Sequence, residues 1–194
     1  MAHSWDGCNA VLDRSHVFPD RQRRINELGR DLINAAFLRG DFLLASGSRT
    51  SYFFDKFLFE TKPGILRRIA SFLAEMVPPE TDRLAGPELG AVPIVTALSL
   101  ETGLPFVIVK KASSRTADGR TCEGEVYSGE RITVVEDVVT SGSEAIRSTR
   151  ELVNIGAQVV AILAVLDREE GAQERLTAAG FLCSSLFRRR ELGL

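Results

Sequence analysis

The feature that most constrains the fold of this chain is a regular alternation between short apolar runs and helical patterns. The apolar runs have the length of buried strands, and the helical patterns repeat apolar residues every three or four positions. Strands that alternate with helices form a parallel sheet with helices on both faces and right-handed connections. We therefore predict an α/β fold with a Rossmann-like parallel sheet. The predicted strands are 83–85, 106–109, 132–135, 159–166 and 181–187, and the predicted helices next to them are 65–76, 92–100, 143–155 and 172–179.

The N-terminal part of the chain has a different pattern. Apolar residues recur at helical spacing over 25–37, and Gly40 is the predicted end of that helix. The β-prone runs Phe42–Leu44 and Tyr52–Phe54 follow, with a Ser-Gly-Ser turn between them. This spacing predicts a hairpin.

The composition excludes several classes of protein. The chain has 24 Lys and Arg against 26 Asp and Glu, so its net charge of −2 offers no basic excess for nucleic acid. No apolar run approaches the roughly 18 to 20 residues of a membrane span, and we expect a cytoplasmic protein without membrane partners. Its three cysteines are scattered and form no CxxC pair, so no metal held by protein side chains is predicted. Residues 20–194 are predicted to be one domain, after an N-terminal tail at 1–19.

The segment 132–146 carries the clearest chemistry. An apolar strand leads to Glu136 and Asp137, and a Thr-Ser-Gly turn then opens directly into a helix at Ser143. Ligands bind at this edge of open α/β sheets, and free N–H groups at a helix N-terminus favour a phosphate. The two carboxylates suit the hydroxyls of a ribose. Any one of these residues is commonly only a solvated or capping residue, but together they predict a cradle for ribose 5-phosphate.

This segment resembles the phosphoribosyl-diphosphate (PRPP) binding signature of type I phosphoribosyltransferases. The resemblance implies the type I phosphoribosyltransferase fold, with a small N-terminal hood at about 20–60 and a core at about 61–187. It also implies a set of residues that bind the ribose and its phosphate. These are Glu136, Asp137, Val138, Val139, Thr140, Ser141, Gly142, Ser143 and Glu144.

Three further segments are similar to the orotate phosphoribosyltransferase branch of that superfamily. They are Gly40 to Asp55, Gly86 to Ile94 and Leu166 to Glu169, in the order and spacing of that family. The resemblance implies transfer of ribose 5-phosphate from PRPP to orotate, giving orotidine 5′-monophosphate and pyrophosphate in de novo pyrimidine (UMP) biosynthesis. It assigns the pyrophosphate loop to Glu88, Leu89 and Gly90, and orotate binding to Phe53, Phe54, Thr140 and Arg168.

The chemistry of orotate agrees with these assignments. Orotate is a flat, anionic pyrimidine, so an aromatic pair offers it a face and the guanidinium of Arg168 offers a charge-assisted partner. Ordinary core packing is an alternative role for at least one of the phenylalanines. A surface ion pair is the alternative role for Arg168.

The family's catalytic loop corresponds here to 110–121, and the resemblance implies a homodimer in which this loop reaches the neighbouring site. It also implies Mg²⁺, bound mainly through PRPP. The first two loop cations are present as Lys110 and Lys111, but Ser114 stands where the family has a lysine and Thr116 where it has a histidine. Arg115 and Arg120 are the two predicted partial substitutes for the missing lysine. We assign Lys110, Lys111 and Arg115 to catalysis.

The changed loop leaves two alternatives to an orotate transferase. The first is a regulatory homologue that binds PRPP or a nucleotide with weak or no catalysis. The second is a phosphoribosyltransferase for another pyrimidine-like acceptor.

Overall fold

The structure is a computed structural model that describes residues 20–43, 47, 49–111, 113 and 119–194. The predicted tail at 1–19 lies outside these residues. The helices are α1 (Arg21–Ala36), α2 (Phe57–Glu60), α3 (Pro63–Ala74), α4 (Ala91–Thr102), α5 (Ser143–Asn154), α6 (Ala172–Ala178) and α7 (Arg189–Leu192). The strands are β1 (Phe37–Leu43), β2 (Arg49–Phe54), β3 (Arg83–Pro87), β4 (Phe106–Val109), β5 (Cys122–Glu123), β6 (Arg131–Val139), β7 (Gln158–Asp167) and β8 (Cys183–Arg188).

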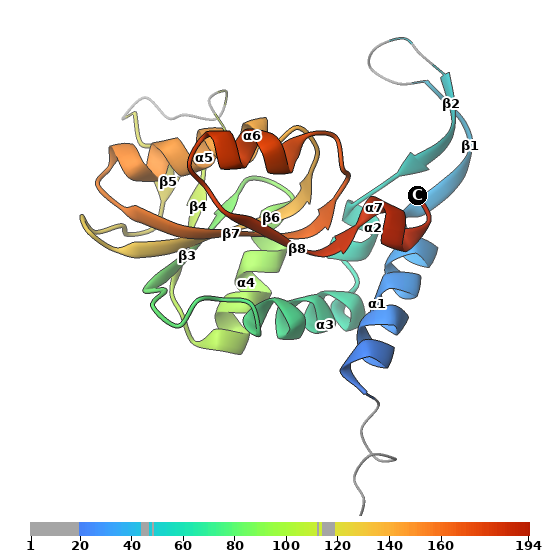
Figure 1. Cartoon of the computed structure of the whole chain (residues 1–194), viewed down its shortest axis with the longest axis horizontal. Helices are drawn as coiled ribbons and strands as arrows, with labels where there is room; N and C mark the ends of the chain where they lie inside the picture. Colours follow the sequence, from blue (N-terminus) through green and yellow to red (C-terminus); the bar gives the residue numbers. More distant parts are fainter. Residues whose placement is uncertain (1–19, 44–46, 48, 112, 114–118) are drawn as a thin grey trace, which may run out of the picture.

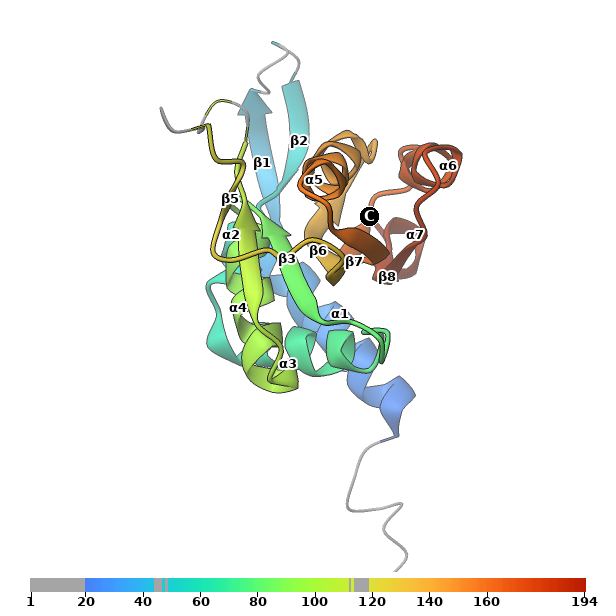
Figure 2. The same cartoon turned by 90° about the vertical axis from the view of Figure 1, so that its left-hand side faces the viewer.

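A six-stranded sheet in the order β5-β4-β3-β6-β7-β8 forms the centre of the molecule. Its strands from β4 to β8 pair in parallel, which confirms the predicted α/β sheet. The exception is the short edge strand β5, which pairs antiparallel with β4. Helices α3 and α4 lie on one side of the sheet and α5 and α6 on the other (Figure 1), and the turned view shows the same layers (Figure 2).

Each face of the sheet has its own hydrophobic core. Neighbouring residues of β6 divide between the two cores, because successive side chains of a strand point to opposite faces. Val135 packs with Phe72 of α3 and Ile94 of α4 in one core. Val134 packs with Leu152 of α5 and Leu176 of α6 in the other.

The hairpin at the N-terminal end is present, but its first strand begins earlier than predicted. Helix α1 ends at Ala36, and β1 starts at Phe37 without an intervening turn. The prediction that Gly40 ends the helix is wrong, because Gly40 lies inside β1. The β1–β2 register shifts between Arg39 and Phe42, so the glycine marks a bulge of the hairpin.

Strand β6 extends further than its apolar run. The prediction ends the strand at Val135, whereas β6 continues to Val139 and therefore includes Glu136 and Asp137.

In the described part of the chain, every helix is too short or too polar to span a membrane.

Candidate active site

Many of the residues singled out in the sequence lie where β3, β4, β6 and β7 end. Each of these strands is followed by a turn, and carboxyl ends of parallel strands meet at one edge of a sheet. The β1–β2 hairpin rises beside the same edge in both ribbon views (Figures 1 and 2). The site is therefore built from the sheet edge and the hairpin region.

The turn between β6 and α5 encloses a cavity of about 120 Å³. Gly142 has a φ of 76°, a left-handed conformation that glycine adopts without steric cost, and it stands directly before α5. Ser143 begins the helix, and its Oγ accepts a hydrogen bond from Arg175 Nη1 at 2.9 Å. The small cavity, the helix N-terminus and a nearby cation suit a phosphate. The cavity is lined by Glu136, Val138, Val139, Thr140, Ser141, Gly142, Ser143, Glu144 and Ala145.

Glu136 is buried at the floor of this cavity. Glu136 is 6% exposed, and its Oε1 has no hydrogen-bond partner among the described residues. Burial, followed by the neighbouring Asp137 carboxylate, raises the pKa of Glu136 to about 8. A carboxyl group with an unpartnered oxygen in a cavity can bind a ligand hydroxyl.

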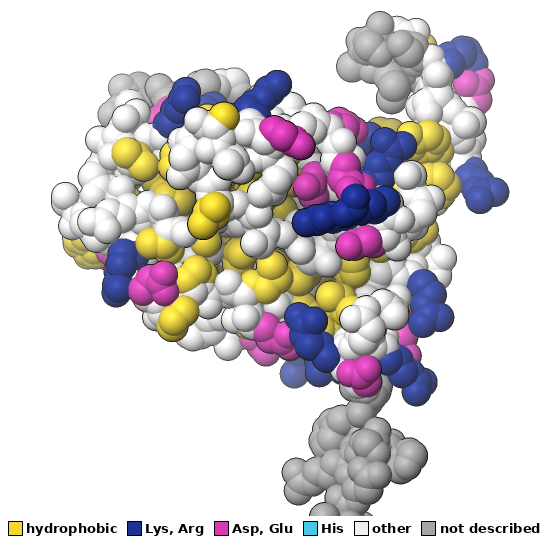
Figure 3. Space-filling model, viewed as in Figure 1, with side chains coloured by type: hydrophobic (Ala, Val, Ile, Leu, Met, Phe, Trp, Pro, Cys, Tyr) yellow, Lys and Arg dark blue, Asp and Glu magenta, His cyan; other side chains and the backbone are white. Residues whose placement is uncertain are grey.

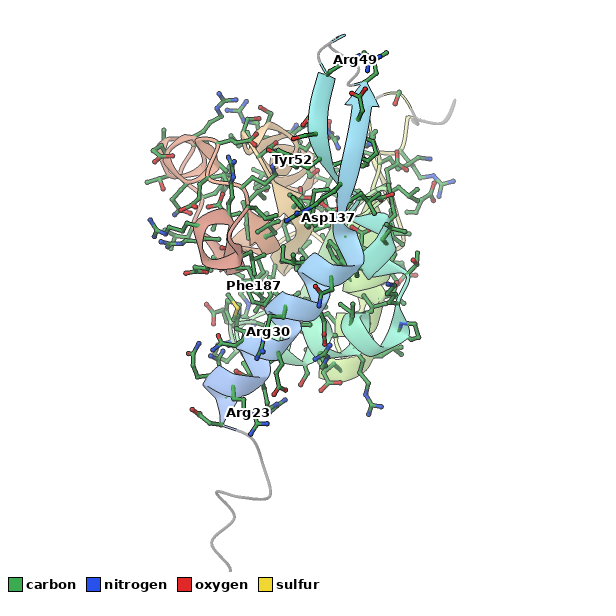
Figure 4. All side chains as sticks on the ribbon, turned by 90° about the vertical axis from the view of Figure 1, so that its right-hand side faces the viewer. Arg23, Arg30, Arg49, Tyr52, Asp137 and Phe187 are labelled. Atoms are coloured by element: carbon green, nitrogen blue, oxygen red, sulfur yellow. The ribbon has the colours of Figure 1, made fainter. Side chains whose placement is uncertain are left out.

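Asp137 does not line that cavity, although the sequence predicts both carboxylates on the same ribose. Adjacent strand residues point to opposite faces, and Asp137 faces the hairpin side of β6. Its Oδ2 lies 2.5 Å from Lys56 Nζ, and its Oδ1 accepts a hydrogen bond from the N–H of Val138. Figure 4 shows Asp137 below the β1–β2 hairpin, with Arg49 at the start of β2 far above it.

The predicted pyrophosphate loop lies against Asp137. A Cβ atom at Gly90 would stand 1.7 Å from Asp137 Oδ2, so only glycine leaves room for this carboxylate. Glu88 accepts a hydrogen bond from the backbone N–H of Lys111 at 2.6 Å, which ties the loop to the end of β4. Leu89 is 65% exposed. The structure thus brings Gly90 and Asp137 together, while Leu89 points into solvent.

The predicted orotate site is divided by the alternation of β2. Phe54, Arg168 and Tyr52 line one cavity of about 10 Å³, which is room for about one water molecule. Phe53 lies on the other face of the hairpin, where its ring centroid is 5.8 Å from that of Phe42. The aromatic pair at the cavity is therefore Tyr52 and Phe54, and Phe53 is not part of it. Leu166, Arg189 and Leu194 complete the lining.

Arg168 is held near this cavity by its neighbours. Its backbone N–H donates to the carbonyl of Val139, and its guanidinium pairs with Glu170 at 2.9 Å. A second pair joins Arg190 to Glu169. Cationic and acidic side chains gather over the end of β8 and α7 on the face shown in Figure 3. Arg168 is 37% exposed in its side chain, so its guanidinium remains accessible to an anionic ligand.

The predicted catalytic loop begins with a buried lysine. Lys110 is 7% exposed, and its Nζ pairs with Glu123 at 2.8 Å. Its carbonyl accepts a hydrogen bond from Arg147. Lys110 is therefore part of the strand-end packing, whereas Lys111 next to it is exposed. Arg115 lies outside the described residues.

Two residues beside Asp137 were not predicted from the sequence. Lys56 forms the ion pair with it, and Glu60 is 1% exposed without a hydrogen-bond partner for either side-chain oxygen in the described structure. Burial, followed by the nearby Asp137, raises the pKa of Glu60 to about 8. The i,i+4 spacing of Lys56 and Glu60 indicates that both side chains face one direction. Nothing in the sequence indicates that they lie near Asp137.

The site also bears on the expected magnesium. No three His, Cys, Asp or Glu side chains of the described residues are grouped so that they could share an ion. The unpartnered Oε1 of Glu136 is an oxygen donor of the kind Mg²⁺ accepts. These residues fit an ion that arrives with a polyphosphate.

A larger hollow of about 690 Å³ lies between α1 and the β8–α7 segment, and none of the predicted site residues lines it.

Comparison with known proteins gives consistent matches. Residues 59–184 match the phosphoribosyl transferase domain family. The chain is 46% identical over 145 residues to the orotate phosphoribosyltransferase of Pyrococcus furiosus, which covers 73% of this chain and 80% of that protein. It is 43% identical over 173 residues to the orotate phosphoribosyltransferase of Pyrococcus horikoshii, which covers 84% of this chain and 93% of that protein.

Solved structures show the same similarity. One structure of the orotate phosphoribosyltransferase of Mycobacterium tuberculosis H37Rv has a TM-score of 0.80 at 28% identity, covering 88% of this chain and 99% of that one. Another, in complex with PRPP, has a TM-score of 0.76 at 27% identity, with coverage of 88% and 99%.

Proposed function

Because this chain belongs to the orotate phosphoribosyltransferase family, we propose that it transfers ribose 5-phosphate from PRPP to orotate. The products are pyrophosphate and orotidine 5′-monophosphate, a step of de novo pyrimidine (UMP) biosynthesis. The observation that carries this proposal is the placement of the phosphate-sized cavity after β6 and the Tyr52, Phe54 and Arg168 cavity at one edge of the sheet.

The ligand parts distribute over the site by their chemistry. The 5-phosphate of PRPP suits the turn Thr140 to Glu144, where backbone N–H groups and hydroxyls meet the start of α5. A ribose hydroxyl suits Glu136, and the pyrophosphate suits the backbone around Gly90. Orotate suits the neighbourhood of Tyr52, Phe54 and Arg168, with its carboxylate toward Arg168. The space of about 10 Å³ between these side chains has to widen to admit the ring.

Catalysis then depends on positioning and on charge. Ribosyl transfer passes through an electron-poor sugar while a strongly anionic pyrophosphate leaves. The residues at the sheet edge hold the sugar carbon between its leaving group and the base, which lowers the entropic cost of the encounter. Cations of the 110–121 loop, with Arg115 as the principal candidate, would balance the charge of the departing pyrophosphate.

Three finer features belong to this proposal. The substrate is taken to be the magnesium complex of PRPP, in which the ion neutralises part of the pyrophosphate charge. The working unit is taken to be a homodimer whose 110–121 loop reaches the neighbouring site. A cytoplasmic location stays a prediction, and so does the division into hood and core.

The comparisons lend no support to a non-catalytic homologue or to another acceptor. The curated relatives that cover most of the chain carry the name of the orotate enzyme. The altered loop residues Ser114 and Thr116 therefore do not by themselves favour a second function.

The proposal is tested by following orotate absorbance with PRPP and Mg²⁺, and by the reverse reaction from orotidine 5′-monophosphate and pyrophosphate. We expect turnover in both directions, with none when Mg²⁺ is chelated. PRPP binding in calorimetry without turnover in either direction would refute the transferase function.

A further inference from the structure

We infer that Lys56 is a pyrophosphate-binding residue, a cation that the segment after the hairpin supplies to the PRPP site. The inference rests on the proposed function and adds a residue to it. It concerns a lysine that lies outside the signature segments at 86–94, 110–121 and 132–146.

The position of the Lys56 ammonium is the first argument. Nζ lies 2.5 Å from Asp137 Oδ2, and a Cβ atom at Gly90 would be 2.8 Å from the same Nζ. The ammonium therefore touches the end of β6 and the turn after β3 at once. A pyrophosphate that approached the Gly90 backbone would meet this charge.

The exposure of the ion pair is the second argument. The Asp137 side chain is 5% exposed, whereas the Lys56 side chain is 36% exposed. The carboxylate thus lies at the bottom of the pair and the ammonium on its open side. An ammonium has three donors, and among the described residues this one donates a hydrogen bond only to Asp137. Donors remain for a second anion.

The surrounding charges are the third argument. Glu60 lies one helical turn after Lys56 and is buried with Asp137, and Glu136 is buried on the other face of β6. Among the described residues, the Lys56 ammonium forms an ion pair with Asp137 and with neither glutamate. An incoming pyrophosphate therefore competes with one carboxylate for this ammonium.

The position of Lys56 also indicates which part of PRPP it would bind. Neither Lys56 nor Asp137 lines the phosphate-sized cavity at 138–145. A charge on the Gly90 side should act on the pyrophosphate and leave the 5-phosphate nearly unaffected. If Lys56 had only a structural role, its substitution would weaken binding of the pyrophosphate and of the 5-phosphate together, because the whole edge of the sheet would shift.

The test compares Lys56→Met with Lys62→Met, an exposed lysine at the start of α3. Calorimetry measures the affinity for PRPP, pyrophosphate and ribose 5-phosphate, each with Mg²⁺. For Lys56→Met we expect affinities for PRPP and pyrophosphate to fall about tenfold or more, with ribose 5-phosphate within about twofold. Lys56→Arg should restore most of the loss, and Lys62→Met should match the parent protein.

Equal losses for all three ligands, or no loss for pyrophosphate, would overturn the inference. If Lys56→Met does not fold, amine labelling of the parent protein decides instead. Pyrophosphate should protect Lys56 and leave Lys62 labelled, and unchanged labelling of Lys56 would reject the role. Failure of the proposed function is distinct, because it appears as absence of turnover in the parent protein.

Discussion

Gly90 shows how one missing side chain can define a site. Its φ of −66° and ψ of −36° are helical, so alanine would be acceptable to the backbone. The obstacle is steric, since the new Cβ would stand 1.7 Å from Asp137 Oδ2. We expect Gly90→Ala to displace Asp137 and lower kcat/KM for PRPP by roughly 100-fold, as small misplacements of reacting groups do. Steady-state kinetics with varied PRPP measures this.

A matched control for that change is Gly64→Ala. Gly64 lies in the first turn of α3, and a Cβ there would meet no atom within 4 Å. This variant should keep the kinetics of the parent and gain up to about 1 kcal/mol of stability from helix propensity. If Gly90→Ala were as active as Gly64→Ala, the contact between Gly90 and Asp137 would have no part in the reaction.

Glu136 gives the folded protein a pH dependence whose sign can be worked out. Its pKa rises from 4.5 to about 8 on folding, so between these values the native state holds a proton that the unfolded chain has released. The unfolded state then binds fewer protons, and stability falls as pH rises through this window. Glu136→Gln should flatten the decline, by about 1 to 3 kcal/mol between pH 6 and 8.5.

Urea unfolding at pH 5.5, 7 and 8.5 measures this slope. Glu101→Gln, at an exposed position of α4, is the control and should leave the slope unchanged. Glu60 contributes in the same direction, so part of the slope should remain in Glu136→Gln. An identical slope in Glu136→Gln and the parent would show that Glu136 is ionised in the folded protein.

At the scale of elements, the alternation of side chains along β2 decides which aromatic residue lies beside the proposed orotate site. Tyr52 and Phe53 are exposed to similar extents, 37% and 41%, but only Tyr52 shares a cavity with Arg168. We expect Tyr52→Ala to raise KM for orotate about tenfold, and Phe53→Ala to change it less than about threefold. Both variants lose an aromatic contact within the hairpin, so thermal unfolding of the two provides the stability control. A larger effect of Phe53→Ala would reverse the assignment.

The elements that the sequence predicts well are those with long, uniform patterns. The apolar runs at β4, β6 and β7 and the helical spacing of α5 are local signals, and the structure confirms all four. The start of β1 was missed, because the helical spacing of apolar residues continues to Phe37 and no glycine or proline interrupts it. The two-residue strand β5 and the four-residue helices α2 and α7 are too short to carry a periodic pattern.

The site was predicted unevenly for a related reason. The turn Thr140 to Ser143 is contiguous, so its cavity could be predicted from one segment. Glu136 and Asp137 were treated as a pair, although strand alternation sends them to opposite faces of β6. Lys56 could not be predicted, since its contact with Asp137 spans 81 positions and depends on how the chain after the hairpin packs on the sheet.

At the scale of the whole molecule, the site draws on distant parts of the chain. Asp137 lies at the end of β6, its ion-pair partner follows the hairpin, and Arg168 follows β7. The proposed loop cation Arg115 would come from a second subunit. The site of a monomer would then lack this loop cation, so we predict that activity requires the homodimer.

That prediction can be tested by mixing two inactive variants. Arg115→Ala removes the loop cation, and Glu136→Ala removes the carboxyl group that the proposed function places on the ribose. In a mixed dimer one site has both changes and the other has neither, if each loop serves the neighbouring subunit. Random exchange of subunits should then restore about a quarter of the parent activity, because half the dimers are mixed and each has one intact site. Activity is measured before and after exchange under mild denaturant, with each variant treated alone as the control. If exchange occurs and no activity returns, Arg115 does not act across the subunit boundary.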